Sequence, residues 1–289
     1  MVASGTRINA TFAIGGLVGE KHSGQVAEKR AEDGNAEKRA VTAKAREVAP
    51  AAGVAPAAGV APAAGVAPGP EPLATASGVR LVRGPRGLAL TDGDMELVED
   101  FSELLPRLRP DRLGRELLVR AARVRGVPAP VAVDATAGLG EDALLLAAAG
   151  FTVALCERDR TIAALLADAL ARAANNPQLA PIVGRMRLVE GDSVEVLAGL
   201  TEPPDVVYLD PMFPGRTKSA AVKKKFQLLH HLEPPCEDAD ALLAAALACG
   251  PRKVVVKRPV KADPLAGARP SHTVRGKAVR YDVIVPPQG

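Results

Sequence analysis

The residues best suited to do chemistry lie in the segment Asp210-Pro211-Met212-Phe213-Pro214, which directly follows the apolar run at 206–209. Asp210 and the carbonyl of Pro211 can accept the two hydrogens of a flat amino group, and Phe213 can stack on the ring that carries it. The exocyclic amine of a nucleic-acid base is a poor nucleophile, so it must be oriented and polarised before it reacts. We therefore expect Asp210, Pro211 and Phe213 to be catalytic. The plainer interpretation is a strand end, a proline turn and a core phenylalanine, which the 2% aromatic content makes less attractive.

A second chemical signal lies upstream, in the segment Val131-Ala-Val-Asp134-Ala-Thr-Ala-Gly138-Leu-Gly140. It formally matches the Gly-x-Gly-x-x-Ala fingerprint of dinucleotide-binding folds. In those folds the strand normally runs straight into the first glycine, so that the pyrophosphate meets a helix N-terminus. Here Asp134 intervenes and would repel a diphosphate, whereas a carboxylate suits the cationic sulfonium and ammonium groups of S-adenosylmethionine. We expect Asp134, Gly138 and Gly140 to bind this cofactor.

Acidic residues also follow the next two apolar runs. Glu157 ends the run that begins at Phe151, where it can accept hydrogen bonds from both hydroxyls of a ribose. Asp192, together with Ser193, follows the run that ends at Glu190, and it can accept from an adenine amino group. Either carboxylate could instead simply serve the start of the following helix as a cap, and this interpretation is stronger for Asp192 than for Glu157.

The elements that must position these residues alternate between strand and helix patterns from residue 130 onward. Near-continuous apolar strands alternating with helices are typical of a parallel sheet covered on both faces, so the expected fold class is α/β. Ligands of such sheets bind beyond the carboxyl ends of the strands, where all the candidate residues fall. The expected strands are 130–135, 151–157, 185–190, 205–210, 253–257 and 279–285. The expected helices are 141–149, 159–174, a short one from 193, and 238–249.

The N-terminal part has a different composition. The unit Val-Ala-Pro-Ala-Ala-Gly begins at Val48 and recurs at Val54 and Val60. Regular prolines forbid a continuous helix and the small residues offer little apolar bulk to bury, so we expect a disordered low-complexity extension over 1–71. Residues 72–127 are expected to form a small N-terminal subdomain, and residues 128–289 the catalytic domain. The subdomain should contain short strands at 78–82 and 87–90 and an amphipathic helix at 111–124, whose arginines form either a solvated or an RNA-contacting face.

Positive charge is concentrated after the amine-binding segment. Residues 215–289 carry 14 Lys and Arg against 6 Asp and Glu, whereas residues 71–214 carry 15 against 21. A basic region beside an acidic cofactor site suits an enzyme that meets a polyanion. Because aromatic residues are few, we expect recognition of a structured RNA through shape and phosphates rather than base stacking. The expected RNA-binding residues are Lys218, Lys223, Lys224, Lys225, Lys257 and Arg258, although a lysine run is more often solvated surface.

Composition argues against several other classes of protein. The mean hydropathy is +0.08, and no stretch approaches the roughly 18–20 apolar residues of a membrane span. The cysteines Cys156, Cys236 and Cys249 are odd in number and lack metal-ligand spacing, and the 4 histidines show no metal-ligand spacing either. We therefore expect a protein without a metal centre or membrane association, in the reducing cytoplasm.

Five segments together resemble the ribosomal RNA small subunit methyltransferase J family, which methylates the N2 amine of a guanine in 16S rRNA. The segments are 133–143 (VDATAGLGEDA), 155–158 (LCER), 206–214 (VVYLDPMFP), 218–224 (KSAAVKK) and 254–259 (VVVKRP). The resemblance runs from about Leu73 to the last residue. Asp-Pro-Met-Phe-Pro followed by Lys-Ser-Ala is its most specific part.

The resemblance implies a class I methyltransferase fold, which is Rossmann-like with a seven-stranded, mostly parallel sheet. It also implies S-adenosylmethionine as donor, and small-subunit ribosomal RNA or the small ribosomal subunit as partner. Two departures from the family pattern are Glu141, where Arg is usual, and Asp192, where Ser is common. The family's cofactor positions fall on Glu141, Asp142, Glu157, Arg158, Asp192, Ser193 and Asp210.

Other functions remain open at this point. One alternative is methylation of adenine N6 or cytosine N4 in RNA or DNA, since the same grip on an amine serves all three bases. Alternatives from other classes are an NAD-binding oxidoreductase and a catalytically silent RNA-binding protein.

Overall fold

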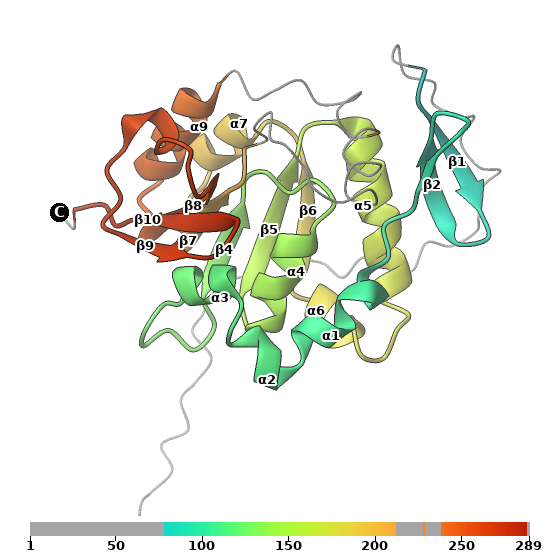
Figure 1. Cartoon of the computed structure of the whole chain (residues 1–289), viewed down its shortest axis with the longest axis horizontal. Helices are drawn as coiled ribbons and strands as arrows, with labels where there is room; N and C mark the ends of the chain where they lie inside the picture. The colour runs from blue at the N-terminus through green and yellow to red at the C-terminus, as the bar shows by residue number, and fades with distance from the viewer. Residues whose placement is uncertain (1–77, 212–227, 229–237, 288–289) are drawn as a thin grey trace, which may run out of the picture. The chain divides into compact units, whose positions relative to one another are not determined.

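The computed structural model describes residues 78–211, 228 and 238–287. Contacts divide the chain into two units, 1–63 and 64–289, and every described residue belongs to the second. The described part of this unit contains one sheet of seven strands and one of three (Figure 1). The extension expected over 1–71 lies outside the described residues, so its disorder stays a prediction.

The seven-stranded sheet follows the order β6-β5-β4-β7-β8-β10-β9. The first five of these strands run parallel to one another, whereas β10 is antiparallel to both β8 and β9. The apolar runs explain the central strands, since β7 is buried at every position. This sheet confirms the expected fold class. The bounds are β4 Val131–Asp134, β5 Thr152–Glu157, β6 Met186–Glu190, β7 Val206–Leu209, β8 Lys253–Pro259, β9 His272–Arg275 and β10 Val279–Ile284.

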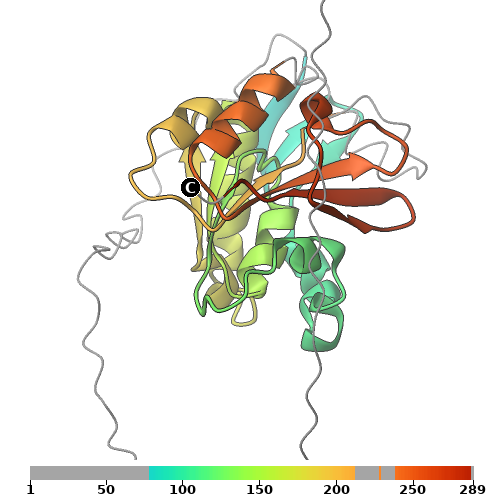
Figure 2. The same cartoon turned by 90° about the vertical axis from the view of Figure 1, so that its left-hand side faces the viewer.

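Helices cover both faces of this sheet, as Figures 1 and 2 show together. One core cluster joins the sheet to α3 and α4, and a second joins it to α7 and α9. The longer helices confirm the sequence pattern, with ends that differ from the expected ones by a single residue. The bounds are α3 Leu117–Ala122, α4 Glu141–Ala148, α5 Arg160–Ala173, α6 Ala180–Val183, α7 Ser193–Ala198 and α9 Ala239–Ala248.

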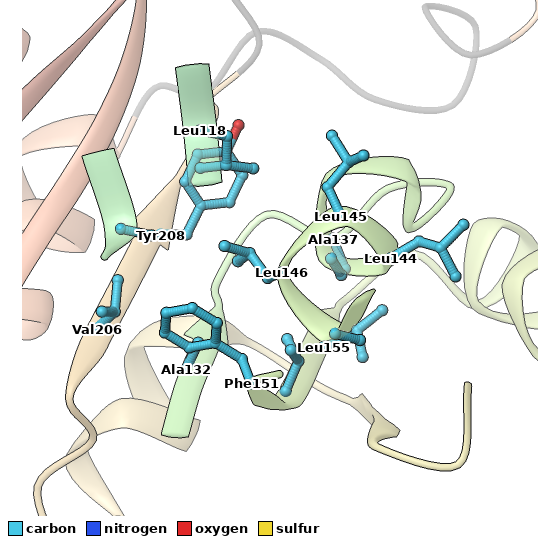
Figure 3. Close-up of a cluster of buried hydrophobic side chains, with 14 of the residues drawn as sticks. Leu118, Ala132, Ala137, Leu144, Leu145, Leu146, Phe151, Leu155, Val206 and Tyr208 are labelled. Atoms are coloured by element: carbon cyan, nitrogen blue, oxygen red, sulfur yellow. The ribbon is translucent and has the colours of Figure 1, made fainter. Parts of the chain in front are cut away.

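Tyr208 is the largest fully buried side chain among the described residues, at 1% exposure. Its ring belongs to the cluster that also holds Leu118 of α3, Leu146 of α4 and Phe151 (Figure 3). A buried tyrosine normally directs its hydroxyl to a hydrogen-bond partner. Here the hydroxyl donates to Asp142 at the start of α4, so the core holds one of the site's carboxylates.

The three-stranded sheet consists of β1 Arg80–Gly84, β2 Gly87–Thr91 and β3 Glu96–Leu97, and it packs against α5. Asp168 of α5 holds it by accepting hydrogen bonds from the backbone N–H of Leu88, at 3.0 Å, and from Arg83, at 2.8 Å. Gly87 has a φ of +119°, and a Cβ there would lie 2.3 Å from Nε of Arg172, so a larger residue does not fit. The two short strands expected at 78–82 and 87–90 are present, while the separate subdomain at 72–127 and its boundaries stay predictions.

The expected helix over 111–124 is wrong, because the chain forms two short helices, α2 Pro110–Leu113 and α3 Leu117–Ala122. They are separated by a turn in which Glu116 takes an extended conformation, with φ −59° and ψ 129°. Arg107 holds the Glu116 carboxylate through two hydrogen bonds of 2.9 Å. Tertiary contacts therefore override the helical periodicity, and Gly114 weakens the helix at the same place. The preceding turns are η1 Phe101–Leu104 and α1 Leu105–Leu108.

Two strands were not predicted from the sequence. β9 lies at the edge of the large sheet and three of its four residues are exposed, so it lacks an apolar run. β3 has only 2 residues. Short or exposed edge strands carry little hydrophobic signal, because only one side of each pairs with a neighbour.

Candidate active site

The candidate residues converge at the carboxyl ends of the parallel strands. Asp134 ends β4 and Glu157 ends β5, while Asp192 and Asp210 follow β6 and β7. Parallel pairing places neighbouring strand ends side by side, with Asp134 opposite Leu155 on one flank and Tyr208 on the other. The expected assembly of these residues at one edge of the sheet is therefore present.

The loop after β4 is built around two glycines with positive φ, Gly138 at 52° and Gly140 at 79°. Gly140 is needed for packing, since a Cβ there would lie 2.7 Å from Cδ1 of Leu166. A Cβ at Gly138 would meet no described atom within 4 Å, so the backbone here borders open space. This arrangement allows a ligand to approach the main chain closely, which fits the cofactor role expected for the loop.

Glu157 ties this loop to the end of β5. Its carboxylate accepts hydrogen bonds from the backbone N–H of Gly138 and of Asp159, both at 2.9 Å, and it is 4% exposed. Asp159 in turn caps α5 through the N–H groups of Thr161 and Ile162. Glu157 is thus fixed in place beside the glycine loop, and its contact with a ribose stays a prediction. Arg158 is exposed next to it.

Asp192 caps α7, the alternative already considered for it. Its side chain accepts a hydrogen bond from the N–H of Val194 at 2.8 Å. The hydroxyl of Ser193 donates to the carbonyl of Ala135, which joins the start of α7 to the end of β4. Both residues therefore have structural partners at the edge where the adenine was expected, and a contact with adenine stays a prediction.

Asp134 is the most deeply buried of the carboxyl groups, at 1% exposure. Burial raises its pKa to about 8, against a hydrogen bond from the N–H of Thr136 that lowers it. The nearby carboxylates of Asp142 and Asp210 raise it further, and Lys257 opposes them. A cationic ligand would favour the ionised form of this group, so the residue fits a positively charged cofactor.

A lysine joins two carboxylates, Asp210 directly after β7 and Asp142 in the first turn of α4. Nζ of Lys257 donates to Oδ2 of Asp142 and to Oδ2 of Asp210, both at 2.8 Å. The hydroxyl of Tyr208 donates to the same Oδ2 of Asp142 at 2.6 Å. The backbone N–H of Asp210 donates to the hydroxyl of Thr136 at 2.7 Å, which fixes the start of the Asp-Pro segment. We call Asp142, Tyr208, Asp210 and Lys257 the acceptor-side cluster.

The charges of this cluster depend on one another. Burial alone would raise the pKa of Asp142, but Lys257 and the Tyr208 hydroxyl hold it below its usual value. Burial raises the pKa of Asp210; Lys257 limits this increase, and Asp142 adds to it. Burial would lower the pKa of Lys257, but the two carboxylates raise it above its ordinary range, so it remains charged. The cluster thus holds two carboxylates on one permanent cation.

Lys257 and Arg258 do not lie on an exposed basic patch. Lys257 lies in the site because the strand register pairs Leu209 with Val256. The residues that follow these two, Asp210 and Lys257, are therefore side by side. Arg258 is 6% exposed and its Nε donates to the carbonyl of Asp263 at 2.9 Å. The contacts of Thr136, Tyr208 and Lys257 with Asp142 and Asp210 were not predicted. The signal for Lys257 was its position directly after the apolar residues 254–256, inside β8.

The remaining predicted residues divide into two groups. Pro211 is buried, and Glu141 and Asp142 begin α4 in half-buried positions. Phe213, Lys218, Lys223, Lys224 and Lys225 lie outside the described residues. Within 78–211, 228 and 238–287, no group of His, Cys, Asp and Glu has a geometry that could hold a metal ion. None of the helices described there is long and apolar enough to cross a membrane.

This strand order, with a glycine loop after the central strand and carboxylates at the following strand ends, is the architecture of S-adenosylmethionine-dependent methyltransferases. Residues 73–286 match a family profile described as putative SAM-dependent methyltransferase. A crystal structure of a SAM-dependent methyltransferase from Neisseria gonorrhoeae superposes with a TM-score of 0.58 at 30% identity. That match covers 76% of this chain and 86% of the other.

Curated relatives carry the resemblance further. Over 175 residues the chain is 50% identical to ribosomal RNA small subunit methyltransferase J of Thioalkalivibrio sulfidiphilus, which covers 60% of this chain and 69% of that protein. It is 49% identical over 169 residues to the protein of the same name from Pseudomonas fluorescens, of which 65% is covered. The chain thus spans about two thirds of the length of these relatives. It belongs to the S-adenosylmethionine-dependent methyltransferase family that includes the ribosomal RNA small subunit methyltransferase J proteins.

Membership confirms the family resemblance, the fold class and the methyl donor expected from the sequence. The residues present fit this donor. The open space beside Gly138 lets it approach the backbone, and the buried carboxyl of Asp134 complements its positive charge.

Proposed function

We propose that this chain methylates the exocyclic N2 amine of a guanine in small-subunit (16S) ribosomal RNA. The observation that carries the proposal is the bridge from Lys257 to Asp210 and Asp142 beside Pro211, which collects hydrogen-bond acceptors around one cation. The names of the matched relatives support the choice of small-subunit rRNA. The resemblance of the Asp-Pro-Met-Phe-Pro segment supports the guanine amine.

On the cofactor side, the chain's task is to hold the donor beside the ends of β4, β5 and β6. When bound, S-adenosylmethionine supplies a methyl group on a cationic sulfur. Asp134 balances positive charge, Glu157 holds the ribose hydroxyls, and Asp192 accepts from the adenine amino group. Because Glu157 and Asp192 are already fixed by backbone N–H groups, little reorganisation is needed when the ligand binds.

On the acceptor side, Asp210 and the carbonyl of Pro211 accept the two hydrogens of the amine and aim its lone pair, with Phe213 stacking on the base. As the nitrogen–carbon bond forms, the bond between the methyl carbon and the donor's sulfur would break and leave its electron pair on sulfur. The nitrogen would become cationic and must lose a proton. Asp210 is suited to take it, because burial raises its pKa above the usual aspartate value. Lys257 keeps Asp210 ionised before the reaction and fixes its orientation at 2.8 Å.

The charge pattern of the cluster favours guanine over the two other bases. Guanine presents two adjacent donors, N1–H and the N2 amine, beside the acceptor O6. The carboxylate of Asp210 suits this pair of donors, and Lys257, which lies between Asp210 and Asp142, holds that carboxylate in place. Adenine and cytosine present an unprotonated ring nitrogen next to their amine, which would face a carboxylate without a hydrogen between them.

The remaining parts of the assignment extend this proposal. The enzyme would act in the cytoplasm on naked small-subunit RNA or on the assembled subunit, with Lys218 and Lys223–Lys225 contacting phosphates. Residues 1–71 would be an extension that takes no part in the chemistry, ahead of the subdomain at 72–127 and the catalytic domain at 128–289.

The deciding experiment is transfer of labelled methyl from S-adenosylmethionine to small-subunit RNA and to particles that lack native modification, followed by digestion to nucleosides. We expect the label in N2-methylguanosine. Label in N6-methyladenosine or N4-methylcytidine would move the substrate to another base. The absence of label from both substrates, with a protein that still binds the donor, would overturn the rRNA assignment.

A further inference from the structure

The segment 105–125 is unusually rich in arginine. It contains 7 arginines, no lysine and only two acidic residues, Asp111 and Glu116. Both acids pair within the segment, Asp111 with Arg109 at 3.4 Å and Glu116 with Arg107 at 2.9 Å. Five arginines therefore remain in excess of the acids of their own segment, and Arg112, Arg115 and Arg120 among them are exposed.

A second pair of exposed cations, Arg275 and Lys277, flanks the turn between β9 and β10. This turn lies against the start of α3, since a Cβ on Gly276 would come 2.5 Å from Cδ1 of Leu117. α3 also contacts β9 and β10 along its length (Figure 1). The two sets of cations therefore adjoin each other. We call Arg112, Arg115, Arg120, Arg275 and Lys277 the arginine face.

The arginine face adjoins the active site. Arg107, which fixes Glu116 just before α3, has its pKa raised first by Glu116 and further by Asp142 and Glu141. Such influence requires proximity to the carboxylates at the start of α4. The β9–β10 turn also lies at the carboxyl end of β8, because Val279 pairs with Pro259, two residues past Lys257. A polymer whose base reaches Asp210 would pass within reach of these cations.

We propose that the arginine face binds the phosphates of the RNA that flanks the target guanine, an inference that rests on the proposed function. Arginine suits this role, because its planar fork binds phosphate through two hydrogen bonds. The large exposed hydrophobic residues of the described chain, Val82, Val131 and Val285, are not part of the face, so it lacks the apolar anchor expected for a lipid surface.

The test compares two charge-reversed variants of the full chain. Arg115→Glu with Arg275→Glu changes the arginine face, and Arg86→Glu with Arg187→Glu makes the same charge change elsewhere. Arg86 and Arg187 are exposed on β1–β2 and on β6, which forms the opposite edge of the large sheet from β9. Binding is measured to deproteinised small-subunit RNA across salt concentrations, with the affinity for S-adenosylmethionine as the check on folding.

The face variant is expected to bind RNA about tenfold more weakly than the control variant, with a salt slope lower by about 1.5 for two lost phosphate contacts. Its KM for RNA should rise while kcat at saturating RNA stays within about twofold. Equal RNA affinity and salt slope in the two variants would overturn the inference. If the face variant bound RNA normally but no longer bound phosphatidylglycerol vesicles, that result would also overturn the inference.

A neutral variant, Arg115→Gln with Arg275→Gln, removes the attraction to phosphate without adding repulsion. Its salt slope should change by at least about half as much as that of the charge-reversed face variant. Because RNA affinity is measured without turnover, the result does not depend on which base is methylated. Failure of the guanine assignment would leave the binding difference in place, whereas failure of this inference would remove that difference and leave methylation unchanged.

Discussion

The two halves of the active site are built in different ways. On the cofactor side, at β4, β5 and β6, the polar side chains are fixed by nearby backbone groups: Glu157 by Gly138 and Asp159, and Asp192 by Val194. On the acceptor side, the contacts run between side chains from distant elements, with Lys257 of β8 joining Asp142 of α4 to Asp210. One half depends on local chain geometry and the other on long-range charge pairing.

This difference has a chemical reason. Caps and glycine turns can hold a ligand in one fixed position, because their partners are rigid main-chain groups. A reacting amine changes its charge during catalysis, and a group that follows that change needs neighbours whose charges balance it. The acceptor-side cluster provides such neighbours, since the pKa of Asp210 reflects burial, Lys257 and Asp142 together. Variants on the two sides should therefore fail in different ways.

The largest effect is expected for Asp210→Ala. Losing the group that receives the amine hydrogen should lower kcat by about 10²–10³-fold, while binding of S-adenosylmethionine persists. The matched control is Asp205→Ala, at the amino end of the same strand, where the carboxylate accepts from the N–H of Val131 at 2.9 Å. Single-turnover methylation of small-subunit RNA measures both. A folded Asp210→Ala protein with normal turnover would contradict the proposed amine site.

Lys257→Met should lower kcat by about 10–10²-fold, because Asp210 loses the partner that orients it. The sign of the pH effect is definite. Lys257 opposes the increase of the Asp210 pKa, so its loss should raise that pKa further and move the acidic limb of the kcat profile to higher pH.

Lys253→Met is the control for this prediction, since Lys253 lies on the same strand but donates to the carbonyl of Arg123 at 2.9 Å. It should leave the pH profile unchanged. An unshifted acidic limb in Lys257→Met would show that Lys257 does not act through Asp210.

The raised pKa of Asp134 predicts that stability and donor affinity depend on pH. The folded protein retains the proton of Asp134 up to a pKa of about 8, whereas the unfolded chain loses it near the ordinary aspartate pKa of 3.8. The stability gained from this group is therefore complete below about pH 4 and is lost as the pH rises through about 8. A cationic ligand favours the carboxylate, so its affinity should increase about tenfold between about pH 6.5 and 8 and then level off.

Calorimetric titration of S-adenosylmethionine at neutral pH, in buffers of different ionisation enthalpy, measures the linked proton. We expect release of close to one proton per donor bound. Asp134→Asn should remove this release together with the pH dependence. Proton release that persists in Asp134→Asn would assign it to another group.

The smallest effect is expected for Asp192→Ala. Loss of the cap on α7 should cost about 1 kcal/mol of stability, and loss of the adenine contact should weaken donor binding about fivefold. Asp159→Ala removes the cap of α5 and should cost a similar free energy of unfolding with little change in donor affinity. Thermal unfolding and donor titration of both variants make the comparison. Equal donor affinity in the two variants would show that Asp192 only caps α7 and does not contact the donor.

The difference between the cofactor side and the acceptor side also determines how much of the site could be predicted from the sequence. The apolar periodicity predicts the strands, the longer helices and the cofactor edge. Gly138 and Gly140 predict a tight loop by residue type alone. The Lys257 bridge depends on the register that pairs Leu209 with Val256, and no pattern within either strand contains that information. The break between α2 and α3 likewise depends on Arg107 holding Glu116 across a turn, against a helical periodicity that continues through it.

The position of β10 also affects the order in which the molecule can be completed during its synthesis. β10 follows β9 in the chain but lies between β8 and β9, so β9 has no strand to pair with until β10 has emerged from the ribosome. The strands at the cofactor edge, β4, β5 and β6, all precede β8 in the chain and so are synthesised first. Lys257 gains its neighbour Tyr281 only with this last strand. In a nascent chain the carboxyl ends of β4, β5 and β6 would therefore be available before Lys257 of β8 can join Asp142 and Asp210.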